Sequence, residues 1–158
     1  MPKKQYLTDS DMNGYYAEVC RAMAHAQYKP DVIIALGRGG LDFGVKLSNW
    51  FDDVEMIPLV WQTRDGGERD ASKLRELLSK YIGGTVLVVD DICDSGVTLN
   101  GINTVVDRFT DSVGTVIVDY AVALHKESSD FEPTWYGRAI MPDEEDTWWV
   151  FPWEAWWK

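Results

Sequence analysis

Two adjacent carboxylates and a hydroxyl-rich turn form the strongest chemical signal in the sequence. Asp90 and Asp91 end an apolar run that begins at Val86, and the turn Asp94-Ser95-Gly96-Val97-Thr98 follows closely. Such a run is typical of a buried parallel strand, and ligands of open α/β sheets bind beyond the carboxyl ends of the strands. The turn precedes an expected helix, whose free N–H groups and positive dipole end bind phosphate. The pattern therefore predicts a phosphate cradle with carboxylates beside it.

Carboxylates next to a phosphate repel it unless another group lies between them. A sugar diol and a hydrated Mg²⁺ can both take that place. Taken singly, Ser95 and Thr98 could instead be helix caps, and the two acids could end a Walker B strand. The chain has no G-x-x-x-x-G-K-[ST] loop, which argues against the Walker interpretation.

A second candidate phosphate-binding loop is Gly37-Arg38-Gly39-Gly40, which directly follows the apolar run at residues 31–36. Glycines let backbone N–H groups approach an anion closely, and the arginine supplies a fixed positive charge. The loop lacks the third glycine of a dinucleotide-binding fingerprint, and alone it could be an ordinary surface turn.

Strands and helices that would position these loops alternate along the chain. Because right-handed crossovers between parallel strands need intervening helices, the alternation predicts an α/β fold with a central, mostly parallel sheet flanked by helices. Residues 63–72 are polar, contain glycine and show no apolar period, so we expect a mobile loop there. The expected strands are residues 31–36, 55–62, 85–90 and 114–124, and the expected helices are residues 9–27, with an N-cap at Asp9 or Ser10, 41–50, 73–81 and 98–109.

Tryptophans concentrate towards the C-terminus. Six of the eight lie at positions 135, 148, 149, 153, 156 and 157, and the acidic run 143–146 precedes the densest group. We expect one domain over residues 1–158, with residues 126–158 forming most of a small aromatic hood.

Composition limits the possible partners. The 158 residues carry a formal net charge of −11, which argues against nucleic acid because phosphate backbones are bound by basic surfaces. No apolar run of about 18 residues is present, so we expect no membrane span. No apolar segment follows Lys3 and Lys4, so we expect no signal peptide and a cytoplasmic location. Cys20 and Cys93 are expected to be free thiols.

The segment from Val86 to Thr98 resembles the phosphoribosyl pyrophosphate signature of type I phosphoribosyltransferases. That signature is a hydrophobic strand, paired acids, a third acid, and then Ser or Thr, Gly, a variable residue and Thr. The resemblance implies that Asp90 and Asp91 hold the ribose hydroxyls and the water shell of Mg²⁺. It implies that the 5′-phosphate lies in the loop of Asp94, Ser95, Gly96, Val97 and Thr98. It also implies that pyrophosphate lies on Arg38, Gly39 and Gly40, and that the Gly37–Arg38 peptide is cis.

The C-terminal segment narrows the acceptor base. Residues 146–154 resemble the hood of bacterial xanthine-guanine phosphoribosyltransferases and related hypoxanthine-guanine enzymes. The resemblance implies that Trp148 stacks on a purine and that backbone groups near Trp149 contact the base edge. Lys126 would donate to O6, which guanine, xanthine and hypoxanthine carry and adenine lacks. Asp94 corresponds to an acid near N7, where a carboxyl can relay a proton as N9 attacks.

The loop at residues 63–72 corresponds to a lid that keeps water from the reacting centre in this family. The residues that could make lid contacts are Arg64, Glu68, Arg69 and Ser72.

We therefore expect a Mg²⁺-dependent enzyme of purine salvage that joins a 6-oxopurine to phosphoribosyl pyrophosphate. The family usually forms dimers or tetramers, so a homodimer or homotetramer is expected. One alternative is a phosphoribosyltransferase for another base. The other is a non-catalytic regulator that senses phosphoribosyl pyrophosphate.

Overall fold

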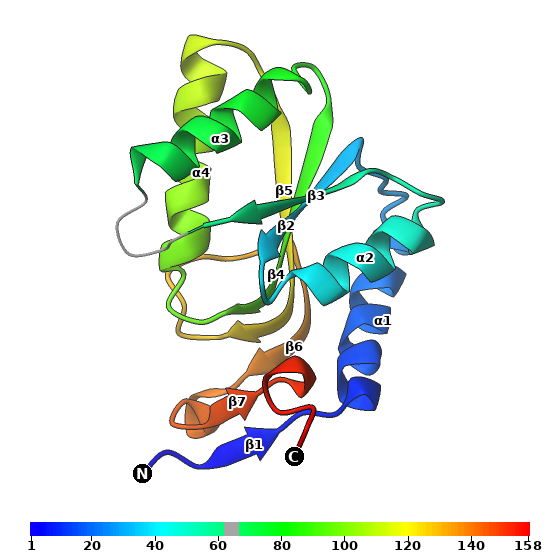
Figure 1. Cartoon of the computed structure of the whole chain (residues 1–158), viewed down its shortest axis with the longest axis vertical. Coiled ribbons are helices and arrows are strands. Elements are labelled where there is room, and N and C mark those ends of the chain that lie inside the picture. Colours follow the sequence, from blue (N-terminus) through cyan, green and yellow to red (C-terminus); the bar gives the residue numbers. More distant parts are fainter. Residues whose placement is uncertain (62–66) are drawn as a thin grey trace.

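A five-stranded parallel sheet forms the centre of the protein (Figure 1). The computed structural model describes residues 1–61 and 67–158. The strand order is β3-β2-β4-β5-β6, and every neighbouring pair is parallel. The predicted α/β fold is therefore confirmed. The strands are β2 (Val32–Gly37), β3 (Met56–Val60), β4 (Thr85–Cys93), β5 (Ile117–Lys126) and β6 (Trp135–Ile140).

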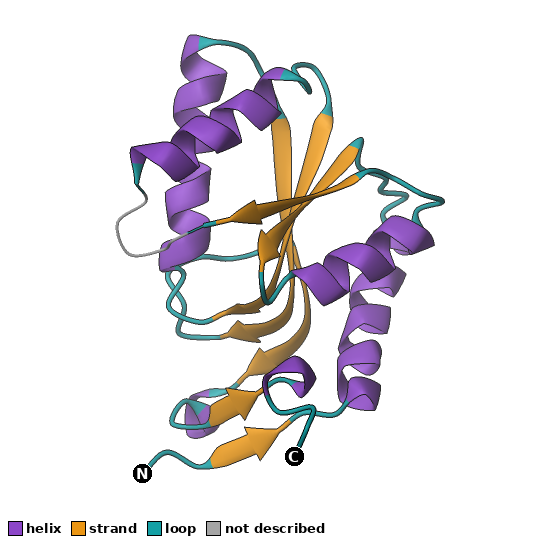
Figure 2. Cartoon of the chain, in the orientation of Figure 1, coloured by secondary structure: helices purple, strands orange, loops and turns teal. Residues whose placement is uncertain are grey.

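Helices cover both faces of this sheet (Figure 2). Successive residues of a strand point to opposite faces, so alternate residues of β2, β4 and β5 enter two separate hydrophobic cores. None of the helices in the described ranges is long and apolar enough to span a bilayer. The helices α1 (Asp9–His25) and α2 (Leu41–Trp50) pack in one core, and α3 (Glu68–Ser79) and α4 (Val97–Ser112) pack in the other.

The start of α1 is fixed by a reciprocal cap that differs from the expected one. Thr8 Oγ1 accepts from the Asp11 backbone N–H at 3.0 Å, and Asp11 Oδ2 accepts from the Thr8 N–H at 2.9 Å. This capping box satisfies two N–H groups at once, so Thr8 is the N-cap rather than Asp9 or Ser10. The buried residues of the helix then follow at three- and four-residue spacing, as expected: Met12, Tyr16, Val19 and Met23.

The prediction of a loop over residues 63–72 is wrong for residues 68–72, which are helical. The helix α3 begins at Glu68, while residues 62–66 lie outside the described part of the chain. Ala71 supplies an apolar position one turn before Leu74, and both side chains are buried. A single alanine among charged residues gives a weak apolar period, which is why the pattern did not indicate this turn. The surrounding residue types nevertheless favour a helix.

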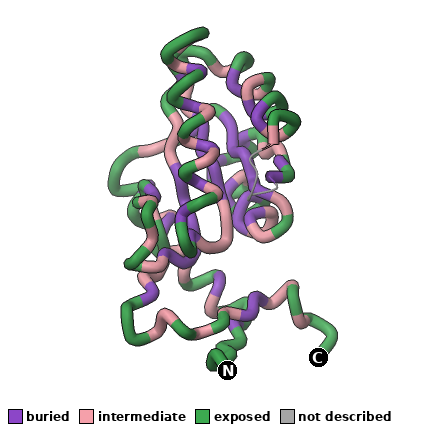
Figure 3. The backbone as a smooth tube through the Cα atoms, turned by 90° about the vertical axis from the view of Figure 1, so that its left-hand side faces the viewer, coloured by how far each residue is buried: buried purple, intermediate pink, exposed green. Residues whose placement is uncertain are grey.

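A second, two-stranded sheet joins the two ends of the chain. Its strands are β1 (Lys4–Tyr6) and β7 (Trp148–Val150), which run parallel. The 3₁₀ helices η1 (Pro142–Glu144) and η2 (Pro152–Glu154) flank β7. Figure 3 shows that this lobe is more exposed than the central strands. The hood therefore differs from the expected segment 126–158, because β6 belongs to the main sheet and β1 completes the small one.

Close packing between β6 and α1 makes Gly137 a sensitive position. A Cβ atom there would lie 2.4 Å from the Tyr15 carbonyl oxygen, so the strand and the helix would have to separate. We expect Gly137→Ala to lower the free energy of unfolding by about 1–3 kcal/mol, as measured by urea denaturation. Gly14→Ala is the control: its Cβ would meet nothing within 4 Å, so it should stabilise α1 by about 1 kcal/mol. Equal unfolding midpoints for the two variants would contradict this packing.

Candidate functional site

The carboxyl ends of β2, β4 and β5 bring most of the predicted site residues to one edge of the sheet. Strand β2 leads into the Arg38-Gly39-Gly40 turn, β4 carries Asp90 and Asp91, and β5 ends at Lys126. Strand β4 runs to Cys93 rather than ending at the first acid, so the paired acids lie within the strand. The turn between β4 and α4 is therefore shorter and more constrained than expected.

The paired carboxylates on β4 carry unbalanced negative charge. Asp90 Oδ1 accepts from the Asp91 N–H at 2.9 Å, and Asp91 Oδ1 accepts from the Ile92 N–H at 2.7 Å. Burial raises the pKa of the Asp90 carboxyl well above its usual range, and the charge of Asp91 raises it further. Burial also raises the pKa of the Asp91 carboxyl. No basic side chain in the described ranges forms an ion pair with either acid, so the pair suits a ligand that brings hydroxyls or a cation.

The glycines after β2 allow the Arg38 turn to lie directly against these acids. A Cβ atom on Gly39 would lie 2.2 Å from Asp91 Oδ2, and one on Gly40 would lie 2.4 Å from the Val89 carbonyl oxygen. The Gly37–Arg38 peptide is cis, as the resemblance implied. The Arg38 side chain is exposed and lines a cavity of about 1230 Å³ that Asp91 also lines. The turn thus places close backbone against Asp91 and a cation in the cavity that Asp91 lines.

The turn from Asp94 to Thr98 encloses a small hollow of about 190 Å³ at the start of α4. Gly96 has φ +92°, and a Cβ on it would lie 2.8 Å from the Phe131 backbone nitrogen. The Ser95 carbonyl accepts from the Asp130 N–H at 3.1 Å, which holds the turn against the 129–131 segment. Among the described residues no side chain caps α4 at Gly96, and the Val97 N–H makes only a long hydrogen bond to Ser95 Oγ at 3.4 Å. The N–H groups that follow it in the first turn remain available for an anion.

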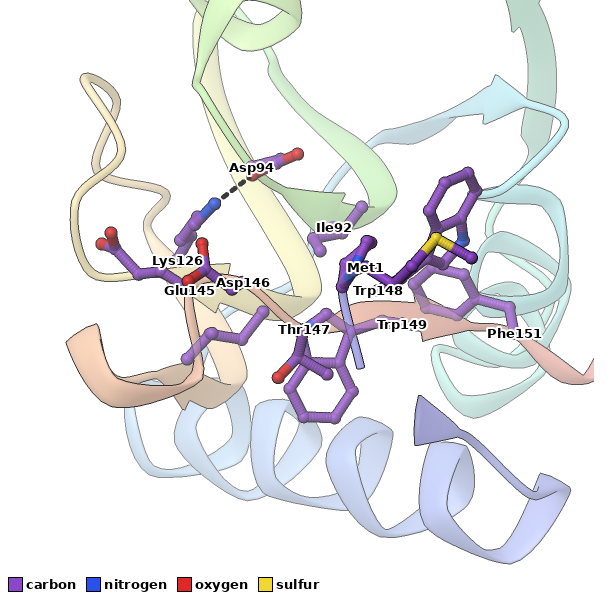
Figure 4. A pocket seen from close by; sticks show the side chains of 12 residues that line it. Met1, Ile92, Asp94, Lys126, Glu145, Asp146, Thr147, Trp148, Trp149 and Phe151 are labelled. Carbon is purple, nitrogen blue, oxygen red and sulfur yellow. Dashed lines mark ion pairs between the residues drawn. The ribbon is translucent and has the colours of Figure 1, made fainter. Parts of the chain in front are cut away.

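A cavity of about 680 Å³, here called the tryptophan cavity, adjoins this turn (Figure 4). Asp94 and Lys126 lie at one end of it, and Trp148 lies towards the other. The Asp94 carboxylate and the Lys126 ammonium form an ion pair at 3.2 Å. Asp94 follows the end of β4 and Lys126 ends β5, so the fold brings these two side chains into direct contact. The resemblance assigns them to neighbouring atoms of the purine ring. The other lining residues are Met1, Pro2, Ile92, Ile140, Glu145, Asp146, Thr147, Trp149 and Phe151.

The two tryptophans of β7 differ in how far their rings are exposed and packed. Trp148 is 58% exposed, so its ring has a free face. Trp149 packs against the core, and the Arg138 guanidinium lies 4.8 Å from its ring centroid. Arg138 also pairs with Glu144 at 2.5 Å. The first ring is therefore available for stacking on a ligand, whereas the second anchors β7 to β6.

Some predicted residues do not join this site. Arg69 and Ser72 are exposed on α3 together with Glu68, and Arg64 lies outside the described residues. Cys93 is buried and contacts the Ser129 hydroxyl at 3.2 Å, and burial raises the pKa of its thiol.

Other lining residues were not expected. Met1 and Pro2 reach the tryptophan cavity because β1 pairs with β7, and a three-residue strand gives no periodic signal. Glu145 and Asp146 also line it; the acidic run was visible in the sequence, but nothing there indicated its position.

Sequence comparison relates the chain to a known family. The family model described as the phosphoribosyl transferase domain matches residues 10–155. A comparison with curated proteins found no match.

Solved structures share the fold at low sequence identity. A purine phosphoribosyltransferase from Pyrococcus horikoshii is 23% identical with a TM-score of 0.70, covering 96% of this chain and 95% of its own. A Helicobacter pylori xanthine-guanine-hypoxanthine phosphoribosyltransferase is 18% identical with a TM-score of 0.68, covering 98% and 95%. A hypothetical protein from Neisseria gonorrhoeae with bound ppGpp is 22% identical with a TM-score of 0.70, covering 98% and 91%.

The raised pKa of Asp90 predicts that this carboxylate lowers the stability of the ligand-free protein. A carboxyl whose native pKa is raised destabilises the fold increasingly as pH rises from its unfolded pKa, about 3.9, through the native value. Asp90→Asn removes that penalty, so the melting temperature of the ligand-free protein should rise by a few degrees at pH 7.5. The gain should shrink as the pH falls towards 4. Differential scanning calorimetry tests this expectation, with Asp107→Asn on the exposed face of α4 as the control. A lower melting temperature for Asp90→Asn than for the unmodified protein would contradict a destabilising role of the Asp90 charge.

Proposed function

Because the chain belongs to the phosphoribosyl transferase domain family, we propose that it transfers the 5-phosphoribosyl group of phosphoribosyl pyrophosphate to N9 of a 6-oxopurine. The products are the nucleoside monophosphate and pyrophosphate, and the physiological setting is purine salvage. The observation that carries the proposal is the Asp94–Lys126 ion pair in the same cavity as the exposed ring of Trp148. The purine neighbours in the structure comparison support it.

The donor binds along the sheet edge. The 5′-phosphate lies in the hollow of the 94–98 turn, where N–H groups at the start of α4 and the hydroxyls of Ser95 and Thr98 donate to it. The ribose hydroxyls donate to Asp90 and Asp91. Pyrophosphate lies against the turn of Arg38, whose charge favours the leaving group as negative charge accumulates on it.

The carboxylate pair fits Mg²⁺. Asp90 and Asp91 are hard oxygen ligands without a basic partner in the described ranges, and no group of three or more potential ligands gathers there. A site with so few protein ligands suits Mg²⁺, which keeps several waters and takes further oxygens from substrate phosphates. When bound, the ion would neutralise charge on the pyrophosphate.

The acceptor base occupies the tryptophan cavity. Trp148 stacks on the purine, a contact worth about 1–3 kcal/mol for one base. The Lys126 ammonium, which only donates, binds the O6 atom, and this excludes the amino group of adenine. The Asp94 carboxylate lies beside N7 and takes part in proton transfer as N9 attacks the anomeric carbon. The bond from that carbon to pyrophosphate breaks as the bond to N9 forms.

A non-catalytic regulator is the second candidate. The hypothetical protein from Neisseria gonorrhoeae that shares this fold holds bound ppGpp, which is a guanine nucleotide. A receptor would use the same phosphate turn and ring contact without turnover. A phosphoribosyltransferase for another base would differ from the 6-oxopurine enzyme and from the regulator because it would turn over adenine or a pyrimidine.

Turnover with separate bases tests the proposed reaction. We expect pyrophosphate release in the presence of Mg²⁺, phosphoribosyl pyrophosphate and guanine, xanthine or hypoxanthine, but not adenine, uracil or orotate. Asp90→Asn and Asp91→Asn should each lower kcat/KM by at least about 100-fold, since both contact the donor where charge develops. Binding of donor without turnover of any base would instead favour the regulator, and turnover only with adenine or a pyrimidine would overturn the roles of Lys126 and Trp148.

Strand β1 should control base affinity through β7. Gln5 lies opposite Trp149 in the parallel ladder, and within residues 1–61 and 67–158 β7 has no other strand neighbour. Gln5→Pro removes a ladder N–H, so β7 loses its support. We expect the KM for the base to rise several-fold while the KM for phosphoribosyl pyrophosphate stays nearly constant. Gln5→Ala keeps the backbone N–H and serves as the control; equal effects on the two KM values would contradict this role.

A further inference from the structure

The 94–98 turn lies directly on the neighbouring segment 129–131, here called the brace. The Asp130 N–H donates to the Ser95 carbonyl at 3.1 Å, which joins the brace to the first half of the turn. A Cβ atom on Gly96 would come within 2.8 Å of two different atoms of the brace, so no gap separates the two segments. The position of the brace therefore sets the position of the turn.

Two buried side chains fasten the brace to the central sheet. His125 of β5 lies opposite Cys93 of β4 in the parallel ladder. The His125 Nε2 atom lies 3.1 Å from the Phe131 carbonyl oxygen. Cys93 Sγ lies 3.7 Å from the same oxygen, and 3.2 Å from the Ser129 hydroxyl oxygen. Because a carbonyl oxygen only accepts, the imidazole carries a proton on Nε2 and donates it to Phe131.

A histidine inside this strand needs an explanation. His125 is 4% exposed, and the four residues before it in β5 are apolar and buried. A buried polar side chain costs free energy unless it is hydrogen-bonded, and an aliphatic residue would fill the position without that cost. The Glu132 carboxylate lies 3.8 Å from Nε2 but is exposed, so it is a weak partner. What the imidazole adds here is its hydrogen bond to the brace.

Other contacts hold the base end of the site. Lys126 lies opposite Ile140 in the ladder between β5 and β6, and the Glu127 N–H donates to the Ile140 carbonyl at 3.0 Å. The backbone of Lys126 therefore stays in place without the His125 side chain. Loss of the imidazole should release the brace and the 94–98 turn, and it should leave the position of Lys126 unchanged.

We propose that His125 is a positioning residue for donor binding. Its Nε2–H fixes the brace, and the brace holds the N–H groups of the 94–98 turn ready for the 5′-phosphate of phosphoribosyl pyrophosphate. A turn that is ordered before the ligand arrives binds more tightly, because the ordering entropy is not lost on binding. The inference rests on the proposed function, since it takes this turn as the site of the 5′-phosphate.

Steady-state kinetics of variants at position 125 test the proposal. His125→Leu removes the donor to the brace, whereas His125→Gln supplies an amide N–H in its place. In His125→Leu the KM for phosphoribosyl pyrophosphate should rise about tenfold, the effect of one lost hydrogen bond, while the KM for the base stays nearly constant. His125→Gln should recover most of the loss. Glu132→Gln is the matched control, which removes the exposed charge near the imidazole and should change neither KM.

Binding measurements separate this inference from the proposed reaction. In the presence of Mg²⁺, the calorimetric Kd for phosphoribosyl pyrophosphate should rise in His125→Leu. The Kd for pyrophosphate alone should stay nearly constant, because pyrophosphate contacts the Arg38 turn. Ser129→Ala loosens the brace without changing the histidine, since the Phe131 N–H loses the hydroxyl that accepts from it at 3.2 Å. It should raise the donor Kd in the same direction, and it serves as the test if His125→Leu does not fold.

The outcomes for the two proposals are distinct. An unchanged donor Kd in the folded variants, an equal rise in the Kd for pyrophosphate, or no recovery in His125→Gln would overturn the role of His125. The expected changes in Kd without turnover of any base would remove the proposed reaction and leave the role of His125 intact. No binding of phosphoribosyl pyrophosphate to the unmodified protein would remove both.

Discussion

Negative charge held at the carboxyl edge of the sheet is the constraint on which the rest of the site depends. Asp90 and Asp91 are adjacent, half-buried and without an ion-pair partner in the described residues, so the ligand-free fold bears their mutual repulsion. The fold tolerates this because β4 is anchored between β2 and β5 by parallel ladders. The turn after β2 contains glycines because Cβ atoms on Gly39 and Gly40 would meet Asp91 and the backbone of β4, whereas Gly96 in the turn before α4 lies against the 129–131 segment.

A strongly acidic protein can still bind a strongly anionic donor. Its net charge of −11 describes the whole surface, whereas the groups expected around phosphate are backbone N–H groups, hydroxyls and one arginine. These act over a few ångströms, and surface charges farther away than a Debye length, about 8 Å at physiological ionic strength, are largely screened. Charge therefore matters more in the tryptophan cavity, where Asp94, Lys126 and Asp146 line the same pocket.

The features with strong local signals could be predicted from the sequence. Continuous apolar runs indicated the inner strands, and the acid pair of β4 with the turn before α4 indicated the sheet edge. Three kinds of feature could not be predicted. The first turn of α3 depends on Ala71, whose burial is a property of tertiary packing. Strand β1 is too short to show a period, and it exists because β7 offers it a partner. The position of Asp146 in the same cavity as Lys126 depends on how β5, β6 and the small sheet meet, which no local pattern encodes.

The small sheet joins segments from nearly opposite ends of the polypeptide. During synthesis on a ribosome, β1 emerges before β7 and cannot pair with it until residues 7–147 have followed. Closing so long a loop costs entropy before the ladder returns any stability. The main sheet can form the turns after β2 and β4 earlier, because its strands lie between these two segments. The wall of the cavity that carries Trp148 is therefore expected to assemble last and, through local unfolding, to open first.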